Sequence, residues 1–462
     1  MQVNEKLRGL NIAIFIDRDV TVRHFLDSKI FNKLAINNNI KLIFPPLDDK
    51  RISAHKNADK YGFDYEIIKI PERRIQLWKW IFFINIQSFR FGKDWKMIRR
   101  FHSILLGKMR YFFKLASLPL VKVFAIALIK NYLLKYKVNE LNNFLDQYKP
   151  DILIHPSIFQ GVYINELALI CNKYKIPFLL LMNSWDNPCL KNTSVYEPSL
   201  IGVWGPQTSF HAKKYMNLKN DKIRILGAAQ FQCFKEEYSQ SRKELLNEYE
   251  LDYKTTLILY AGSSRGNDEF KHLLKLEKIC KNIDNSLKIL YRPHPWLSDV
   301  EITKKILNYK SKVISIDNNM IEFMKLVIKG GVNKFYSTDY MHTHNILGAA
   351  DIVVSPLSTI LIEALCHGKE SICLIPKEED EGDLSKTWKA LPCFQEVIRS
   401  PGIKTIEHLD DLEFVLKSCF KNCKKEKFLL KNKFHSRFFV DMEGPSYSER
   451  LENCILELTK KT

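Results

Sequence analysis

Apolar residues recur along the chain in two patterns that alternate, and this alternation predicts a β-α-β layout. Near the start, an apolar run at 11–16 predicts a strand, helical spacing follows at 25–38, and 41–46 predicts a second strand. A helix between two such strands indicates a parallel sheet. Further on, strands are predicted at 149–157, 176–188, 198–205 and 222–226, and helices at 138–147, 161–174 and 208–217.

The second half of the chain starts the same alternation again. Its predicted strands lie at 255–264, 287–295, 312–317, 350–356 and 370–376, and its predicted helices at 268–281, 357–368, 408–420 and 445–461. A length of 462 residues is too great for one core, because cores stop growing at about 250–300 residues. We therefore expect an α/β protein with two doubly wound, Rossmann-like domains that face a cleft, where the carboxyl ends of the strands bind the ligand.

Three boundaries follow from this pattern. The N-terminal domain is predicted at 1–235, with a basic, aromatic, helical insertion at about 71–137. The second domain is predicted at 236–440, and a C-terminal helix at 441–462.

The net charge of +19 is concentrated in the segment 71–137. Its only acids are Glu72 and Asp94, whereas Lys, Arg, Trp, Phe and Tyr alternate throughout it. Such a composition fits an anionic membrane surface or a phosphorylated acceptor. It also fits nucleic acid, but no nucleic-acid motif accompanies it, so we expect no nucleic-acid partner. The alternative is a helical subdomain whose aromatic residues form a core and whose lysines are merely solvated.

Targeting signals are weak. The apolar run at the N-terminus is short and ends at Asp17, unlike a signal peptide, and Lys122 and Lys130 interrupt the apolar stretch 115–134, which makes it a poor transmembrane span. The ten cysteines are scattered through apolar stretches, as is typical of reduced core thiols in a cytosolic protein. These features predict a cytoplasmic protein with peripheral contact to the inner face of the membrane.

The sharpest chemical motif follows the predicted strand 287–291. Arg292 and His294 alternate with two prolines in Arg-Pro-His-Pro, and a guanidinium and a ring N–H both suit phosphate oxygens. The alternative is a turn at the end of a strand with a structural histidine.

A second motif joins a strand to a helix. Ser355, Ser358 and Thr359 stand where the predicted helix begins, so they suit N-capping and an anion site equally well. Glu363, one turn further, would accept the ribose hydroxyls of a nucleotide, unless it is only a solvated helix residue.

A third motif is the loop Gly262, Ser263, Ser264, Arg265, whose small residues allow the backbone to approach a phosphate. It lacks the G-K-[ST] of a P-loop and the G-x-G-x-x-G of a dinucleotide site.

Together, the Arg-Pro-His-Pro motif and the segment SPLSTILIEALCHGK resemble the C-terminal donor domain of GT-B bacterial surface-polysaccharide transferases. These include capsule-type transferases that use CMP-activated sugars and CDP-glycerol glycerophosphotransferases. The resemblance covers about 255–455 and implies that the donor's phosphates and nucleotide bind the residues Arg292, His294, Ser355, Ser358, Thr359 and Glu363. The tail FVDMEGPSYSERL also resembles the end of GT-B transferases and sugar-nucleotide 2-epimerases, which implies that the last helix packs back across the domains.

This sequence departs from those families in some motifs. The further acidic and Tyr-Ser motifs of the glycerophosphotransferases and the general-base motif of the polysialyltransferases are not evident, so UDP, GDP and dTDP donors stay open beside CMP and CDP. The N-terminal half matches in its layout and in the short motif Ser184-Trp-Asp-Asn.

The acceptor side is expected in the N-terminal half, where an inverting transfer needs a base. Asp17, Asp19 and His24 follow the first strand, and Asp186 follows a later one. The alternatives are that Asp19 caps a helix, that His24 lies on a helix flank and that Asp186 is a turn residue. Asp17 and Asp19 form a D-x-D, but helix dipoles and basic side chains can neutralise a diphosphate, so we predict no metal and no cofactor beyond the nucleotide-sugar donor.

We therefore expect a metal-independent glycosyltransferase that moves a sugar to a growing cell-surface glycan or lipid-linked acceptor, such as capsule or lipopolysaccharide. Three alternatives stay open: a CDP-polyol-type phosphotransferase, a sugar-nucleotide epimerase, and a non-catalytic lipid- or glycan-binding protein.

Overall fold

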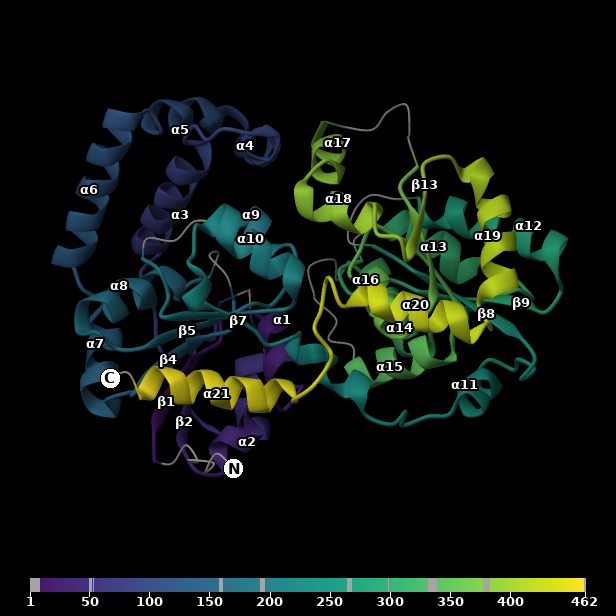
Figure 1. The fold of residues 1–462 in the computed structure, drawn as a ribbon, viewed down its shortest axis with the longest axis horizontal. Helices are drawn as coiled ribbons and strands as arrows, with labels where there is room; N and C mark the ends of the chain where they lie inside the picture. Colours follow the sequence, from purple (N-terminus) through teal and green to yellow (C-terminus); the bar gives the residue numbers. More distant parts are fainter. Residues whose placement is uncertain are drawn as a thin grey trace. The chain divides into compact units, whose positions relative to one another are not determined.

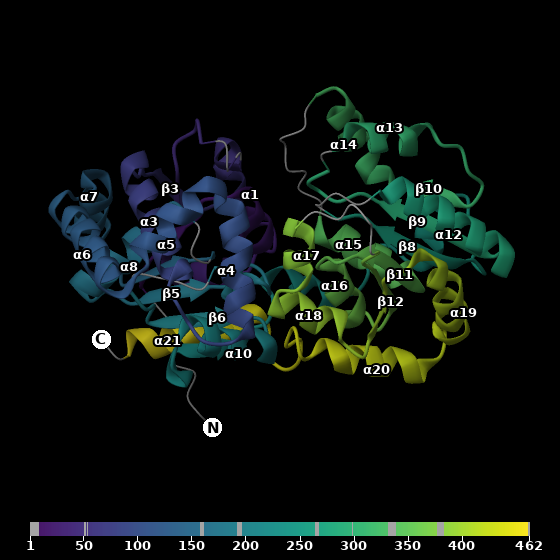
Figure 2. The same ribbon diagram turned by 90° about the horizontal axis from the view of Figure 1, so that it is seen from above.

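The computed structural model describes residues 9–49, 52, 54–157, 161–191, 196–263, 268–297, 299–330, 339–376 and 383–460, without the side chains of 54–57 and 383–385. The chain divides into two compact units, each with its own parallel sheet (Figures 1 and 2). The first unit comprises 1–232, 382–393 and 440–462, and the second comprises 233–381 and 394–439.

The sheet of the first unit has seven parallel strands in the order β3-β2-β1-β4-β5-β6-β7. The chain builds outward from β1 to β3 and then returns to β4, on the other side of β1. The strand order therefore reverses between β1 and β4, which is where a doubly wound sheet forms a crevice at its carboxyl edge. The strands are β1 (Asn11–Phe15), β2 (Asn39–Phe44), β3 (Asp64–Ile67), β4 (Ile152–His155), β5 (Phe178–Leu181), β6 (Leu200–Val203) and β7 (Ile223–Ile225).

Helices cover both faces of this sheet, because alternate side chains of each strand point to opposite sides. Ile12 and Ile14 join a core that includes residues of α21, while Phe15 points the other way and contacts Phe144 and Tyr163 edge-on. The helices are α1 (Asp19–Thr21), α2 (Asn32–Ala35), α7 (Asn139–Tyr148), α8 (Ile164–Tyr174), α9 (Asn187–Leu190), α10 (Pro206–Met216) and α21 (Tyr447–Thr459). The first unit also includes α17 (Asp383–Lys389), which contacts the helical insertion and not the sheet.

The basic segment forms a helical insertion between β3 and α7 (Figure 1). It consists of α3 (Glu72–Gln87), α4 (Lys93–Leu106), α5 (Arg110–Ala116) and α6 (Pro119–Lys135). A buried ion pair anchors it: Nε and Nη2 of Arg74 donate to the two carboxylate oxygens of Glu166 in α8, at 2.6 and 2.7 Å. Trp78 Nε1 donates to the same carboxylate at 2.7 Å. Three side-chain N–H donors therefore fix α3 to α8.

None of the described helices is by itself long and apolar enough to cross a membrane. Two neighbouring helical stretches, Lys93–Ala116 and Pro119–Lys135, meet the criteria of length and composition only together, and a bend of 101° separates them.

The second unit has six parallel strands in the order β10-β9-β8-β11-β12-β13, so its order reverses between β8 and β11. Ile258 and Tyr260 face one core, and Leu257 and Leu259 face another. The strands are β8 (Thr256–Ala261), β9 (Leu287–Arg292), β10 (Ile314–Ile316), β11 (Ile352–Pro356), β12 (Glu370–Leu374) and β13 (Ile403–Ile406). The helices are α11 (Arg242–Glu248), α12 (Glu269–Ile283), α13 (Val300–Asn308), α14 (Asn318–Ile328), α15 (Tyr340–Ala349), α16 (Ile360–Cys366), α18 (Pro392–Ile398), α19 (Leu412–Asn422) and α20 (Glu426–Ser436).

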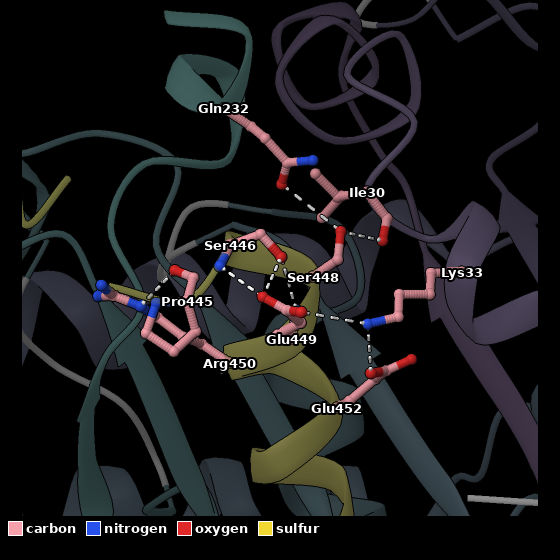
Figure 3. Close-up of polar contacts among 9 residues, drawn as sticks. All are labelled: Ile30, Lys33, Gln232, Pro445, Ser446, Ser448, Glu449, Arg450 and Glu452. Carbon is pink, nitrogen blue, oxygen red and sulfur yellow. Dashed lines mark hydrogen bonds and ion pairs between the residues drawn. The ribbon is translucent and has the colours of Figure 1, made fainter. Parts of the chain in front are cut away.

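The last helix, α21, returns to the first unit (Figure 3). Ser446 and Glu449 form a capping box at its start, and Ser448 Oγ donates to the carbonyl oxygen of Ile30 at 3.1 Å. Lys33 Nζ lies 3.7 Å from Glu449 Oε1. The buried side chains of α21 complete the core of the first unit, and they are Tyr447, Leu451, Cys454, Ile455 and Leu458.

One predicted helix was wrong in its extent. The segment 25–38 is not continuous: a wide helical turn covers Val22–Leu26, and α2 covers Asn32–Ala35 alone. Lys29, between them, has a φ of 57°, in the left-handed region that a helix cannot continue through.

Candidate functional site

Motif residues of the second unit gather at the carboxyl edge of its sheet, around the reversal between β8 and β11. Gly262 and Ser263 follow β8, Arg292 ends β9, and Ser355 lies in β11. The Gly262 N–H donates to the carbonyl oxygen of Arg292 at 2.8 Å, so two of the three predicted motifs touch each other directly. Parallel strands bring their carboxyl ends to one edge, which explains why residues distant in sequence meet here.

The loop after β8 is held by a buried carboxylate. Glu269 Oε1 accepts a hydrogen bond from the Ser263 N–H at 2.8 Å, and its Oε2 accepts one from the Tyr291 hydroxyl at 2.7 Å. A Cβ on Gly262 would lie 2.7 Å from both carboxylate oxygens, so this position needs a glycine. Burial raises the pKa of Glu269 to about 7, although both hydrogen bonds oppose the rise. Ser264 and Arg265 lie outside the described residues.

Arg292 is buried and engaged in a polar cluster. Its Nη2 donates to Thr343 Oγ1 at 2.9 Å, and its Nε lies 3.6 Å from Asp317 Oδ2. Asp317, at the end of β10, also contacts His342 Nε2 at 3.0 Å. Burial of Asp317 opposes its ionisation, but His342 and Arg292 outweigh burial and lower its pKa. The guanidinium is thus balanced by a carboxylate and held in one orientation.

His294 lies in the loop after β9 with its ring partly exposed. The Trp296 N–H donates to its Nδ1 at 3.0 Å, so the neutral ring carries its proton on Nε2. That tautomer presents an N–H donor, as binding of a phosphate oxygen requires. The indole of Trp296 is 53% exposed beside it and offers a flat apolar surface at the same loop.

The Ser355–Glu363 motif is more buried than its sequence implies. Ser355 Oγ is fully buried, donates to the Pro356 carbonyl at 2.8 Å and lies 2.9 Å from Ser358 Oγ. Thr359 occupies the N-cap position of α16, but its side chain accepts no capping hydrogen bond from the backbone N–H groups of the first turn, so the expectation of side-chain capping by Thr359 was wrong. Glu363 is 6% exposed, which excludes the alternative of a solvated helix residue.

A pair of histidines that sequence reasoning did not single out lies beside α16. His344 Nε2 donates to the Glu236 carbonyl at 3.1 Å, and His367 Nδ1 donates to the Glu363 carbonyl at 2.8 Å. His344 Nδ1 and His367 Nε2 lie 2.8 Å apart, and neither carries a proton when both rings are neutral. A hydrogen bond between these two nitrogens therefore requires that one ring be protonated. Burial lowers the pKa of both rings and disfavours that proton. Tyr238 stacks on His344 with ring centroids 4.2 Å apart.

In the first unit, Asp17 ends up in a fully buried position beside the reversal between β1 and β4. Its Oδ2 accepts from the Val162 N–H at 2.7 Å and lies 3.8 Å from His155 Nε2. A Cβ on Gly161 would lie 2.2 Å from the same oxygen. Burial alone would raise the pKa of Asp17, but His155 and the other neighbours outweigh it and lower the pKa to about 2. Asp17 is therefore a buried anion that organises the loop.

The other acceptor-side candidates differ in exposure. His24 is buried, its Nδ1 lies 3.0 Å from the Asn183 carbonyl oxygen, and burial lowers its pKa to about 3, which makes it a weak base. Asp19 is the first residue of α1, but Arg18 holds the N-cap position, so the alternative of Asp19 as a cap was wrong. Asp186 is partly exposed and accepts from Ser184 Oγ at 2.5 Å.

Lys191 follows α9 near these carboxylates. Burial lowers its pKa, while the negative charges of Asp186 and Asp17 oppose that shift. Sequence reasoning missed Lys191 and His155, because neither belongs to a recognisable motif.

No protein-family model matches the chain, and no curated protein matches its sequence. Solved structures do match over nearly its whole length. The glycotransferase of kitacinnamycin is 10% identical with a TM-score of 0.53, over 98% of this chain and 100% of that one. A putative UDP-N-acetylglucosamine 2-epimerase from Listeria monocytogenes is 10% identical with a TM-score of 0.52, over 97% of this chain and 95% of that one. The wall teichoic acid polymerase TagF, soaked with CDPG, is 11% identical with a TM-score of 0.51, over 98% of this chain and 89% of that one.

The fold is GT-B. Two Rossmann-like units, each with a parallel sheet that reverses its strand order, were predicted from the hydrophobic pattern and are confirmed. At 10–11% identity the likeness concerns the fold alone. The chemistry of this GT-B protein has to be argued from its own residues.

Among the described residues, no three His, Cys, Asp or Glu side chains converge as metal ligands would. Of the D-x-D pair, Asp17 is buried and already bonded to the Val162 N–H. Metal independence stays a prediction.

Proposed function

We propose that this GT-B protein is a glycosyltransferase that binds a nucleotide-sugar in its second unit and transfers the sugar to a cell-surface glycan or a lipid-linked acceptor. One observation carries the proposal: at the carboxyl edge of the sheet, Arg292 ends β9 buried and fixed, its carbonyl accepts from the glycine loop, and His294 follows it with an oriented ring N–H. These are the groups that a diphosphate needs, placed where doubly wound sheets bind their ligands.

Within the proposed site the residues have different roles. His294 would donate its Nε2–H to the donor's phosphate and stabilise the charge that develops on the leaving nucleotide. Arg292, held by Asp317 and Thr343, would add positive potential without having to reorganise. Glu363 would accept a ribose hydroxyl, as the motif resemblance implies.

The donor nucleotide is proposed to be CMP- or CDP-linked. TagF, which has this fold, was solved with CDPG, which supports a cytidine diphosphate. The Listeria protein with this fold is a putative UDP-N-acetylglucosamine 2-epimerase, which supports a UDP-linked donor as the alternative. No metal ion is proposed to take part, because cationic side chains can neutralise the diphosphate.

The acceptor side is proposed to lie in the first unit, with Asp186 as the base. Asp17 and His24 are less suited, because Asp17 is buried with a pKa of about 2 and the pKa of His24 is about 3. Asp19 is partly exposed and is the second candidate. The reaction is proposed to occur on the cytoplasmic side of the membrane, in the assembly of the cell envelope.

Two other activities fit the same fold. An epimerase of the kind named for the Listeria structure would convert a nucleotide-sugar without an acceptor. A CDP-polyol-type phosphotransferase, which the CDPG-soaked TagF structure keeps open, would form phosphodiesters instead of glycosidic bonds. Product analysis separates the three: a glycoside, an isomerised nucleotide-sugar, or a phosphodiester.

The test is stabilisation by nucleotides. Thermal unfolding is followed with CMP, CDP, UDP, GDP and dTDP, with and without magnesium, for the wild type, His294→Ala and the matched control His408→Ala, an exposed histidine of the same unit. A nucleotide at about 100 times its Kd should add roughly 2.7 kcal/mol to the wild type and the control, and far less to His294→Ala. No stabilisation by any nucleotide would refute the donor site.

A further inference from the structure

The helical insertion contains a cavity of about 370 Å³ that is lined mainly by cations. Five of its lining residues are basic, and they are Lys96, Arg99, Arg100, Arg110 and Lys114. The others are Gln87, Ser103 and Ile104. These residues come from the end of α3, from α4 and from α5, so the folding of the insertion, and not one basic run, builds the cavity.

The insertion itself supplies little negative charge to balance these cations. The insertion has two carboxylates in its sequence, and Asp94 is taken by Lys214 Nζ at 2.5 Å and by the Tyr215 hydroxyl at 2.9 Å. Among the described residues, Lys96, Arg99, Arg110 and Lys114 form no ion pair with a carboxylate.

The cavity is nevertheless partly organised. Arg99 Nη1 donates to the Arg90 carbonyl at 2.9 Å, and Ser103 Oγ donates to Gln87 Oε1 at 3.1 Å. Burial lowers the pKa of Arg99, because it removes water from the charged guanidinium. An anion bound in the cavity would offset that loss of solvation. Clusters of arginine and lysine side chains that are held in place are typical of phosphate-binding sites.

Exposed apolar side chains lie on α5, one of the helices that line the cationic cavity, and on the helix after it. On α5, Arg110 and Lys114 line the cavity, whereas Tyr111 and Leu115 are 63% and 62% exposed. The next helix, α6, is mostly apolar and has no separate polar face, since its lysines are spread around it, yet among its residues only Leu133 is buried. Its exposed apolar residues include Leu120, Val121, Val123, Phe124, Leu128 and Leu134.

A helix that is apolar all round normally lies in a core or in a membrane. Here α6 is exposed in the structure of the chain alone, at the outer side of the insertion (Figure 1). Aromatic and aliphatic side chains beside lysines and arginines match the layered chemistry of a membrane interface, with hydrocarbon next to phosphate.

We propose that the cavity binds the phosphate headgroup of a lipid, while α6 and the exposed side of α5 lie in the membrane interface. The shared ligand chemistry is a phosphomonoester or diphosphate, and the apolar surface assigns it to a lipid. This deepens the proposed function, because such a lipid would be the acceptor or would hold the enzyme beside it; the binding itself does not depend on transferase activity.

Vesicle binding by the full-length protein tests the proposal. The probes are phosphatidylcholine vesicles, the same vesicles with a minority of phosphatidic acid, and inorganic pyrophosphate as a competitor. The cavity variant is R99Q/R110Q/K114Q. The matched control is K421Q/K424Q/K427Q, which removes the same charge from exposed lysines of the second unit. A third variant, F124S/L128S, removes apolar side chains of α6.

Wild type and control should bind phosphatidic acid vesicles and hardly bind phosphatidylcholine. The cavity variant should lose on the order of 100-fold in affinity, because each basic residue near an anionic surface adds about 1 kcal/mol. F124S/L128S should lose vesicle binding and keep pyrophosphate binding. Circular dichroism and thermal unfolding establish that each variant is folded.

Three outcomes would overturn the proposal. Equal losses in the cavity variant and the control would show that net charge alone attracts the protein. Binding of pyrophosphate that the cavity variant loses, without binding of vesicles, would assign the cavity to a free phosphate compound. Absence of both would leave the cavity without a ligand. Nucleotide stabilisation, measured on the same preparations, is unaffected by any of these results, so failure here is distinct from failure of the donor site.

Discussion

Replacing Glu269 by glutamine should change how the stability of the second unit depends on pH. Glu269 is 4% exposed and accepts hydrogen bonds from the Ser263 N–H and the Tyr291 hydroxyl. Glutamine has the same shape, can accept from Ser263 and can donate its amide hydrogen to the oxygen of Tyr291. It differs mainly in being neutral at every pH, so the substitution isolates the effect of the buried charge.

The sign and size follow from the pKa of the carboxyl group. Burial raises it from 4.5 to about 7, so the folded chain holds a proton on Glu269 that the unfolded chain has released. The stability contributed by the protonated form is complete below pH 4.5 and is lost as the pH rises through 7. Each unit of difference between the folded and unfolded pKa corresponds to about 1.4 kcal/mol of unfolding free energy. With a pKa raised from 4.5 to about 7, the folded chain loses about 3 kcal/mol of stability by pH 8.

Urea unfolding at pH 5 and pH 8 measures this loss. The wild type should be destabilised at pH 8 relative to E269Q by up to about 3 kcal/mol, while the two proteins should differ little at pH 5. The matched control is Glu322→Gln, an exposed helix carboxylate of the same unit, which should follow the wild type. If E269Q and the wild type show parallel pH dependence, Glu269 is ionised in the folded chain and the argument from burial is wrong.

Two further substitutions test the first unit. Gly161→Ala should destabilise it by about 1–3 kcal/mol, because the new Cβ would lie 2.2 Å from Asp17 Oδ2; a variant as stable as the wild type in thermal unfolding would mean that the loop moves away freely. Arg74→Ala should lower the free energy of unfolding by about 3–5 kcal/mol, because it leaves the buried Glu166 carboxylate with Trp78 as its remaining side-chain donor. The control is R73A, which removes a neighbouring arginine outside this ion pair. Urea unfolding should show the loss of stability in R74A alone.

The hydrophobic pattern was sufficient to predict the GT-B layout, because buried parallel strands form continuous apolar runs. It was insufficient for edge strands such as β3 and β13, whose residues are partly exposed and therefore mixed in polarity. The left-handed Lys29 inside a helical pattern also had no signal in the sequence.

The donor-side motifs were visible because Arg292 and Ser355 end apolar strands, and strand ends of a parallel sheet meet at one edge. Their partners were not visible. Asp317 also ends a predicted strand and could have been found by applying the same rule. Glu269 resembles an ordinary acid in the first turn of a helix, and only the absence of a side chain at Gly262 lets it reach the loop. His155 stands alone in the sequence, and its proximity to Asp17 is purely tertiary.

The return of α21 to the first unit has a consequence for synthesis on the ribosome. Residues 1–232 leave the ribosome first, but the core that Leu451 and Ile455 complete stays open until α21 has been translated. At about 5–20 residues per second, the second unit takes on the order of 10–40 s to translate. During that interval the core of the first unit is incomplete and its apolar residues are exposed, and the emergence of α21 closes it.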